Sequence, residues 1–309
     1  MYLNSKSSST TNNNNAFVPP PSERGGSNCF SESATVQVEN KGSVSMISLQ
    51  VGDRVLTGSS IYQPVYSFGH RHEDLEGTFY QIYTDKSNHT PLEMTSGHLV
   101  FVLDNENQLQ PVRADAVKAG DRVMKSESQE DDMHPALVTK VATIQKKGMY
   151  MPLTPDGLII VDEILSSTYV SIQDQAPIVV DNSKLFPFLT EDKILHWFMS
   201  PVRMLCLGVS SNACQILERS RDEEGIHSYL MAGRSLAEFA NQQGFFVQMF
   251  LIGIPVFLLF AFLNLLEVLL GGPGLAPFVC FAAITLGGWV VNKRHGMISN
   301  SQESNKKLE

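Results

Sequence analysis

Gly52-Asp53-Arg54-Val55 and Gly120-Asp121-Arg122-Val123 are the same four residues at two points of a 309-residue chain. The flanks are similar as well, because Leu49 and Val51 precede the first copy as Val117 and Ala119 precede the second. Glycine followed by aspartate is a frequent turn signal, so one copy alone would indicate only a turn. Four identical residues with similar flanks predict an internal duplication within one domain.

Short apolar runs surround both copies from Ala34 to about Ile172. Glycine, aspartate, asparagine and proline separate these runs, which is typical of the short strands of an all-β domain. The expected strands are 34–38, 44–47, 54–56, 79–84, 98–103, 137–144 and 158–161. The chain is therefore predicted to be mainly β over residues 29–172, with pseudo-twofold character from the repeat.

The composition changes on both sides of this domain. Residues 1–28 are rich in Ser, Asn, Thr, Pro and Gly and lack the apolar stretch of a signal peptide, so we expect a disordered segment. Helical periodicity in Glu191–Leu207 and Ser228–Gln243 predicts a helical section over residues 173–244. Residues 292–309 are expected to form a disordered tail.

Two apolar runs lie between residues 245 and 291. Phe245–Leu266 is longer than the ~20 residues that span hydrocarbon, and Leu275–Val291 is at the short end of the range of about 17–25 residues. Gly271-Gly272-Pro273-Gly274 would break a helix between them. We therefore expect a two-span transmembrane hairpin and a membrane localisation, the alternative being a helical hairpin buried in a protein core. Lys293-Arg294-His295 favours a cytoplasmic C-terminus, and the compartment stays open.

Charge and cysteine content narrow the function classes. A formal net charge of -9 without a basic stripe argues against nucleic acid as a partner. The four cysteines have no regular spacing, which predicts neither a disulfide framework nor a zinc site. We expect no other metal and no cofactor.

Cys29 stands at the start of the expected β domain, in Ser27-Asn28-Cys29-Phe30. Its thiol reaches the carbonyl carbon of Asn28 through a five-membered ring, so proximity favours attack and formation of a thioester. The departing amine needs a proton, which a histidine can donate while a hydroxyl orients the group. Thr95 and His98, just before an expected strand, match these roles. These three residues are the candidate catalytic residues, and Asn28–Cys29 is the candidate scissile bond.

Together these features resemble the Hint domain, the self-cleaving module of hedgehog C-terminal halves and inteins, and most of all its hedgehog branch. The resemblance covers roughly residues 29–205. It runs through Cys29-Phe30, Gly52–Leu56, Phe79–Asp85, Thr95 with His98, Ala114-Asp115, Pro152–Thr154 with Gly157, and Ser167–Tyr169. His196–Arg203 looks like the helical region that contributes to sterol recognition in hedgehogs.

The resemblance implies a single-turnover cysteine autoprocessing reaction, and the two apolar runs predict that the protein carrying it is membrane-anchored. The substrate would be the protein's own N-terminal segment, and water, a sterol or another lipid alcohol would resolve the thioester.

Three positions depart from the hedgehog pattern. Asn28 replaces a glycine and crowds the attack on its carbonyl, and Thr168 stands where hedgehogs have a second cysteine. His70, in Phe68–Arg71, falls where hedgehogs have an aspartate that helps to activate the sterol hydroxyl, so it is the candidate general base for the second nucleophile.

Two other functions remain open at this point. A catalytically silent Hint fold would serve as a membrane-tethered interaction module. Protein splicing would use Asn182 and Ser183, but this position lies beyond the expected end of the β core and lacks the histidine that assists asparagine cyclisation. We favour autoprocessing, which N-terminal sequencing would reveal as a chain that begins at Cys29.

Overall fold

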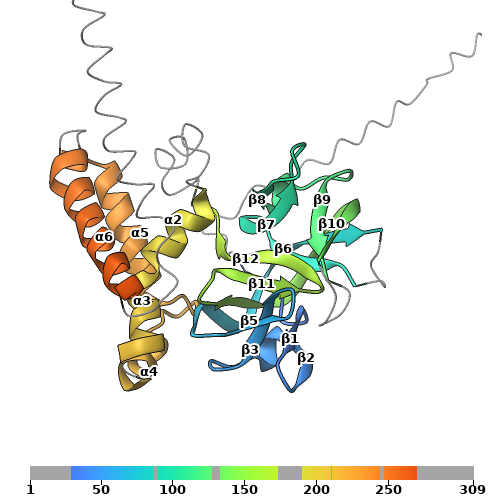
Figure 1. Ribbon diagram of the computed structural model, residues 1–309, viewed down its shortest axis with the longest axis horizontal. Coiled ribbons are helices and arrows are strands. Elements are labelled where there is room, and N and C mark those ends of the chain that lie inside the picture. The colour runs from blue at the N-terminus through green and yellow to red at the C-terminus, as the bar shows by residue number, and fades with distance from the viewer. Residues whose placement is uncertain are drawn as a thin grey trace, which may run out of the picture.

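The computed structural model describes residues 29–85, 90–126, 133–172, 190–209, 211–243 and 247–269. In Figure 1 the strands form one body, and the helices gather on one side of it. Several predictions fall outside the described residues. They concern the segments 1–28 and 292–309, the second apolar run 275–291, and the splicing candidates Asn182 and Ser183.

The strands of the described chain are β1 Thr35–Val38, β2 Gly42–Ser45, β3 Arg54–Gly58, β4 Ile61–Pro64, β5 Ser67–Thr84, β6 Leu92–Thr95, β7 His98–Leu103, β8 Leu109–Arg113, β9 Arg122–Lys125, β10 His134–Leu153, β11 Leu158–Val161 and β12 Ile164–Val170. They join in the order β4-β3-β1-β11-β12-β7-β9-β10-β5-β6, with β2 paired to β1 and β8 paired to β7. The mainly β prediction is confirmed, and β7 and β11 have the predicted bounds.

The two Gly-Asp-Arg-Val copies build the same turn. Gly52 and Gly120 both have a φ of 97°, a left-handed conformation that glycine adopts without a steric penalty. Gly52 N donates to Val65 O at 2.8 Å, and Gly120 N donates to Val138 O at 2.9 Å. In each copy the aspartate carboxylate accepts from the backbone N–H three residues earlier, at 3.0 Å and 2.9 Å. The predicted duplication is confirmed by these matched hydrogen bonds.

Strands β5 and β10 are longer than the sequence predicts. They have 18 and 20 residues and pair antiparallel along most of their length. The expected strands 79–84 and 137–144 cover only part of them. The remaining stretch of β5 includes the charged, partly exposed run His72–Glu76, so no apolar alternation marks it as a strand. Its extended form follows from pairing with β10.

The helices of the described chain are α2 Glu191–Phe198, α3 Ser200–Met204, α4 Ser211–Arg219, α5 Ser228–Asn241 and α6 Ile254–Leu269, with π-helical segments at Leu205–Val209 and Val247–Gly253. The predicted helix Glu191–Leu207 is divided into α2 and α3 because Pro201 lies in the first turn of α3, where a proline is tolerated. Helix α5 agrees with the predicted Ser228–Gln243. Gly233 within it makes room for Phe198, whose ring would lie 2.4 Å from an added Cβ.

The first predicted membrane span, Phe245–Leu266, coincides largely with the π-helical segment and α6. Helix α6 has 16 residues, and two of its polar side chains, Asn264 and Glu267, are buried against the protein. Asn264 Nδ2 donates to Ser200 Oγ at 3.1 Å. Within the described ranges, no helix is both long enough and apolar enough to cross a membrane. The predicted two-span hairpin therefore finds no support in this part of the chain.

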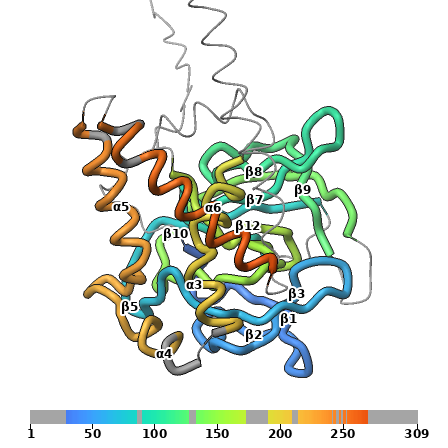
Figure 2. Tube along the Cα trace, turned by 60° about the vertical axis from the view of Figure 1, so that its left-hand side comes forward, coloured from blue at the N-terminus to red at the C-terminus, as the bar shows by residue number. Residues whose placement is uncertain are grey.

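Of the three clusters of buried apolar side chains in the described residues, two bear on the position of Cys29. The larger one lies within the β domain and includes Phe30, Val55, Ile82, Val123 and Val161. The second joins the sheet to the helices and consists of Cys29, Tyr66, Phe79, Met149, Met151, Leu153, Tyr169, Met199 and Val202. In Figure 2, turned by 60° from Figure 1, α3 and α6 lie in front of the strands and α5 lies to their left. The candidate nucleophile thus lies where the sheet meets the helical section.

Candidate active site

Cys29 lies between β6 and β10 at the start of the described chain. The next residue, Phe30, forms isolated antiparallel bridges with Tyr150 of β10 and Met94 of β6. The Cys29 side chain is fully buried, and this burial raises the pKa of the thiol well above its ordinary value. The thiol is therefore protonated near neutral pH. Because the thiolate is the reactive form, attack by Cys29 requires a base.

Thr95 contacts the backbone of Cys29 through two atoms. Cys29 N donates to Thr95 Oγ1 at 2.6 Å, and Thr95 N donates to Cys29 O at 2.9 Å. The nitrogen that would leave during cleavage before Cys29 thus lies against the hydroxyl. This is the position that the predicted orienting role requires.

His70 lies at the thiol. Its Nδ1 is 3.1 Å from Cys29 Sγ, and its Nε2 is 2.6 Å from Glu224 O. A carbonyl oxygen only accepts, so Nε2 carries the proton, and Nδ1 of the neutral ring accepts from the thiol. Burial lowers the pKa of His70, which keeps the ring neutral near pH 7. The sequence suggested His70 only as a base for the second nucleophile, whereas this contact also makes it a candidate base for Cys29.

His98 contacts the residue that follows the nucleophile. Its fully buried ring packs against Phe30, with the ring centroids 4.1 Å apart. Its Nε2 donates to Ser167 O at 2.9 Å, which orients the ring. Asn28 lies outside the described residues, so the approach of His98 to the Asn28–Cys29 amide stays a prediction.

A polar network supports the residues just after Cys29. Glu93 of β6 is buried and accepts from Ser31 Oγ at 2.7 Å, from Lys146 Nζ at 2.7 Å and from Gln81 Nε2 at 2.8 Å. Hydrogen bonds to a charged group are stronger than neutral ones. The network therefore fixes the start of the domain against β5, β6 and β10. The sequence did not indicate this network, because its members come from separate strands.

A largely apolar cavity of about 300 Å³ lies beside His70. Strands β5, β10 and β12 form one side of it, and α2, α5 and α6 form the other. Its lining includes His70, Met151, Trp197, Phe198, Leu230 and Phe260. Apolar cavities of roughly 300–1,000 Å³ with a few polar groups are typical of small-molecule sites. Two of the lining aromatic residues, Trp197 and Phe198, belong to His196–Arg203, for which the sequence predicted a role in lipid recognition.

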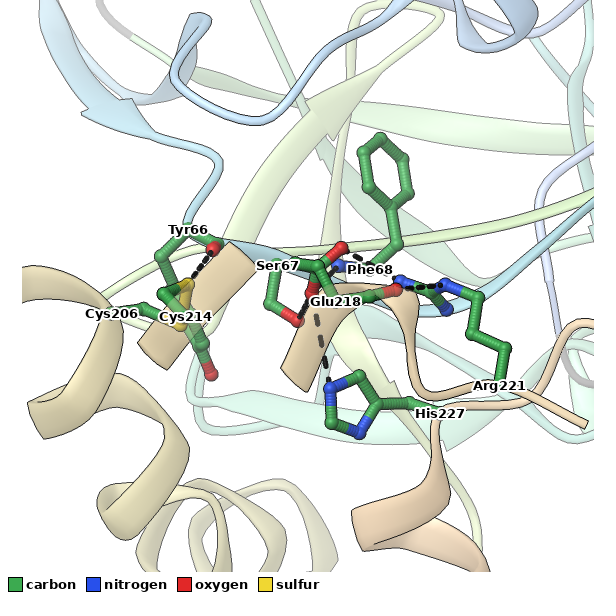
Figure 3. The surroundings of a disulfide bond; sticks show 8 residues. All are labelled: Tyr66, Ser67, Phe68, Cys206, Cys214, Glu218, Arg221 and His227. Carbon is green, nitrogen blue, oxygen red and sulfur yellow. Dashed lines mark hydrogen bonds and ion pairs between the residues drawn. A yellow bond between two sulfur atoms is a disulfide. The ribbon is translucent and has the colours of Figure 1, made fainter. Parts of the chain in front are cut away.

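Cys206 and Cys214 form one disulfide, which the sequence, predicting no disulfide framework, did not identify. Their Cα atoms, in the segment Leu205–Val209 and in α4, are 4.7 Å apart, which cysteine spacing alone does not reveal. Figure 3 shows that Glu218, further along α4, faces the start of β5. Glu218 accepts from Ser67 Oγ and from Phe68 N. Helix α4 is thereby tied to the strand that carries His70.

Residues 21–241 match the family model described as the Hint module. This match covers more than half of the chain, so the chain belongs to the Hint module family. The fold described above, with its duplicated turn and its buried N-terminal cysteine, agrees with this assignment.

Hedgehog proteins are among the relatives of this chain in sequence. The chain is 28% identical to Protein hedgehog from Drosophila pseudoobscura pseudoobscura over 218 residues, which are 69% of this chain and 41% of that protein. It is 33% identical to Sonic hedgehog protein from Danio rerio over 158 residues, which are 48% of this chain and 37% of that protein. The chain thus spans less than half the length of these relatives. The comparisons support self-cleavage in general terms.

Solved structures of inteins are also similar. The gp41-1 intein has a TM-score of 0.37 at 16% identity, and the match covers 45% of this chain and 98% of that chain. A DnaB intein from Synechocystis has a TM-score of 0.39 at 10% identity, and the match covers 47% of this chain and 100% of that chain.

Proposed function

We propose that this protein cleaves its own Asn28–Cys29 bond and transfers the N-terminal segment to a lipid alcohol. The observation that carries the proposal is the set of contacts at Cys29. Its nitrogen donates to Thr95 Oγ1 at 2.6 Å, its sulfur lies 3.1 Å from His70 Nδ1, and the apolar cavity lies beside His70. These contacts bring a leaving nitrogen, a nucleophile, a base and an acceptor cavity together.

The first step is an N-to-S acyl shift. Cys29 Sγ forms a bond to the carbonyl carbon of Asn28 while its proton passes to His70 Nδ1, and the carbon–nitrogen bond then breaks. The Cys29 nitrogen accepts a proton and becomes a free amine. His98 is the proposed donor of this proton from Nδ1, as an imidazolium ring whose Nε2 proton is held by Ser167 O, and Thr95 holds the nitrogen in place. The product is a thioester.

The second step resolves the thioester. A hydroxyl oxygen attacks the Asn28 carbonyl carbon and gives its proton to a base, the carbon–sulfur bond breaks, and Cys29 regains its thiol proton. Once His70 has given the thiol proton of the first step to solvent, it is the proposed base, because it lines the cavity and also contacts Sγ. The same imidazole would therefore serve both steps.

A lipid alcohol suits the cavity better than a polar acceptor. The lining is mostly aliphatic and aromatic, and burial of apolar area contributes about 25 cal/mol per Å². A sterol belongs to this class, and water is the competing nucleophile that an apolar lining disfavours. Because His70 stands where hedgehogs have an aspartate, experiment has to identify which alcohol is the acceptor.

Attachment to a membrane is part of the same proposal. Its support is a row of exposed apolar side chains along the last π-helical segment and α6, namely Phe250, Leu251, Leu258, Leu259, Phe262 and Leu269. Contiguous exposed apolar surface of this kind is typical of lipid or protein contacts. An acceptor lipid would then reach the cavity from the bilayer.

The test is cleavage of the purified full-length chain followed by mass spectrometry. Hydroxylamine should release a fragment that begins at Cys29, because it attacks a thioester directly and leaves the Cys206–Cys214 disulfide intact. Cys29→Ala should abolish the fragment, and Cys280→Ala is the matched control. An intact wild-type chain under these conditions would refute the proposal and favour a catalytically silent Hint fold.

A further inference from the structure

The loop Asp222–His227, between α4 and α5, extends the sheet at the site. It belongs to the helical section, far along the chain from β5, yet its backbone pairs with β5 on both sides of His70. His227 N donates to Gly69 O at 2.9 Å, and Arg71 N donates to Gly225 O at 3.0 Å. The loop therefore behaves as a short additional strand at this edge of β5.

One carbonyl of this loop faces the catalytic histidine. Glu224 O accepts from His70 Nε2 at 2.6 Å, which requires the proton on Nε2. The lone pair of Nδ1 then points toward Cys29 Sγ, 3.1 Å away. In the other neutral tautomer, Nε2 would present a lone pair to the carbonyl oxygen, and Nδ1 could not take the thiol proton.

The loop is held in place by a glycine and an arginine. Gly225 has a φ of 82°, and a Cβ there would lie 2.3 Å from Arg71 O, so the close approach to β5 depends on the missing side chain. Arg221 Nη1 donates to Gly225 O at 3.2 Å, and its Nη2 donates to Glu218 Oε2 at 2.8 Å. The ion pair between Glu218 and Arg221 is drawn in Figure 3. The loop thus has a fixed backbone beside His70.

We infer that the loop Asp222–His227 is a positioning element, whose Glu224 carbonyl selects the His70 tautomer that takes the proton from Cys29. The inference rests on the proposed function, which it deepens. It assigns the helical section a task in the acyl shift itself, in addition to forming one side of the cavity. An isolated β domain would lack this carbonyl.

The experiment compares Gly225→Ala with Gly208→Ala in the full-length chain. Gly208 has nothing within 4 Å of an added Cβ, so it controls for loss of a glycine in the same section. Histidine labelled with ¹⁵N reports the tautomer of His70 in a Cys29→Ala background, where no cleavage occurs. Hydroxylamine-dependent cleavage reports the rate of thioester formation in the background that keeps Cys29.

We expect the parent and Gly208→Ala to show His70 protonated on Nε2, and Gly225→Ala to show a mixture of tautomers. The rate of cleavage by Gly225→Ala should fall at least about tenfold, since a correctly protonated base contributes roughly 10²–10⁴-fold. Arg221→Met loosens the loop without a clash, so its cleavage rate should lie between those of the parent and Gly225→Ala. An unchanged tautomer and rate in both variants would overturn the inference. Absence of cleavage by the parent would instead refute the proposed function, and the ¹⁵N measurement would still decide whether the loop sets the tautomer.

Discussion

The β domain and the helical section hold the site by different means. The β domain places Cys29 largely through main-chain hydrogen bonds, such as Thr95 N to Cys29 O and the pairing of Phe30 with Tyr150. Side-chain ion pairs hold the helical section together, and Arg203 with Glu267 is the most deeply buried of them. Main-chain pairing tolerates many sequences, whereas a buried ion pair depends on both partners. Placement of the candidate nucleophile thus combines main-chain pairing with the Glu93 network, whereas the cavity and the orientation of His70 depend on the helical section.

The largest expected effect is on the free energy of unfolding, and it concerns the ion pair in the helical section. Arg203 is fully buried and donates to both carboxylate oxygens of Glu267, at 2.6 Å and 2.8 Å. Arg203→Met leaves a buried carboxylate without its partner and should lower the free energy of unfolding by about 3–5 kcal/mol. Urea denaturation measures this loss. The double variant Arg203→Met with Glu267→Leu should recover most of it, and a single variant as stable as the parent would show that the pair does not hold α6.

An intermediate effect is expected on the rate of transfer to a lipid alcohol, which depends on the cavity, but not on thioester formation, which depends on the β domain. Ala237 lines the cavity from α5, and Ala237→Phe fills it. The ring would occupy space that the acceptor needs, at a cost of about 1–3 kcal/mol to its binding. Transfer to a lipid alcohol supplied in vesicles should therefore slow roughly ten- to hundredfold. Hydroxylamine-dependent cleavage should be unchanged, because it needs only the thioester. Ala240→Phe, on the same helix but outside the cavity lining, is the matched control. Equal losses in transfer and in hydroxylamine cleavage would contradict the separation.

A third effect, gradual in pH, concerns the β domain. Asp162 accepts from Thr35 N at 2.8 Å and from Thr35 Oγ1 at 2.9 Å, and burial raises the pKa of Asp162 from 3.8 to about 7. Between these values the folded protein binds more protons than the unfolded chain. The free energy of unfolding should therefore fall as the pH rises through this window, by at most about 1.4 kcal/mol per pH unit.

The Asp162 contribution is isolated by comparison with Asp162→Asn, which is neutral at every pH and keeps an acceptor oxygen. Urea denaturation at several pH values should show that the parent loses stability relative to the variant between pH 4 and 7. Above that window the difference should be constant. Parallel pH curves for the two proteins would show that Asp162 does not titrate as its burial implies.

The β domain was largely predictable because its signals are local. Gly52 and Gly120 need a positive φ for the same turn, so the same short motif occurs twice. Cys29 and Thr95 were identified as candidates by type and spacing, and they are in contact. The lengths of β5 and β10 were underestimated, since their exposed charged stretches carry no apolar alternation.

The helical section was predictable in its helices but not in its contacts. The periodicity of Ser228–Gln243 indicated α5, yet nothing in it revealed that the preceding loop reaches His70. Cys206 and Cys214 gave no recognisable pattern for their disulfide. The apolar run that suggested a membrane span contacts α3 through two polar side chains. Asn264 donates to Ser200, and Glu267 accepts from Arg203.

The sequence by itself determined the mainly β class, the duplicated turn and the family, and it named Cys29 as the candidate nucleophile, because each rests on neighbouring residues or on a short motif. Tertiary structure alone decided that His70 faces the Cys29 thiol, that Glu224 O holds its other nitrogen and that a cavity lies beside it. The physical reason is separation along the chain, since His70 and Glu224 lie 154 residues apart. Local propensity does not encode a contact between such residues, and only the packing of the helical section on β5 brings them together.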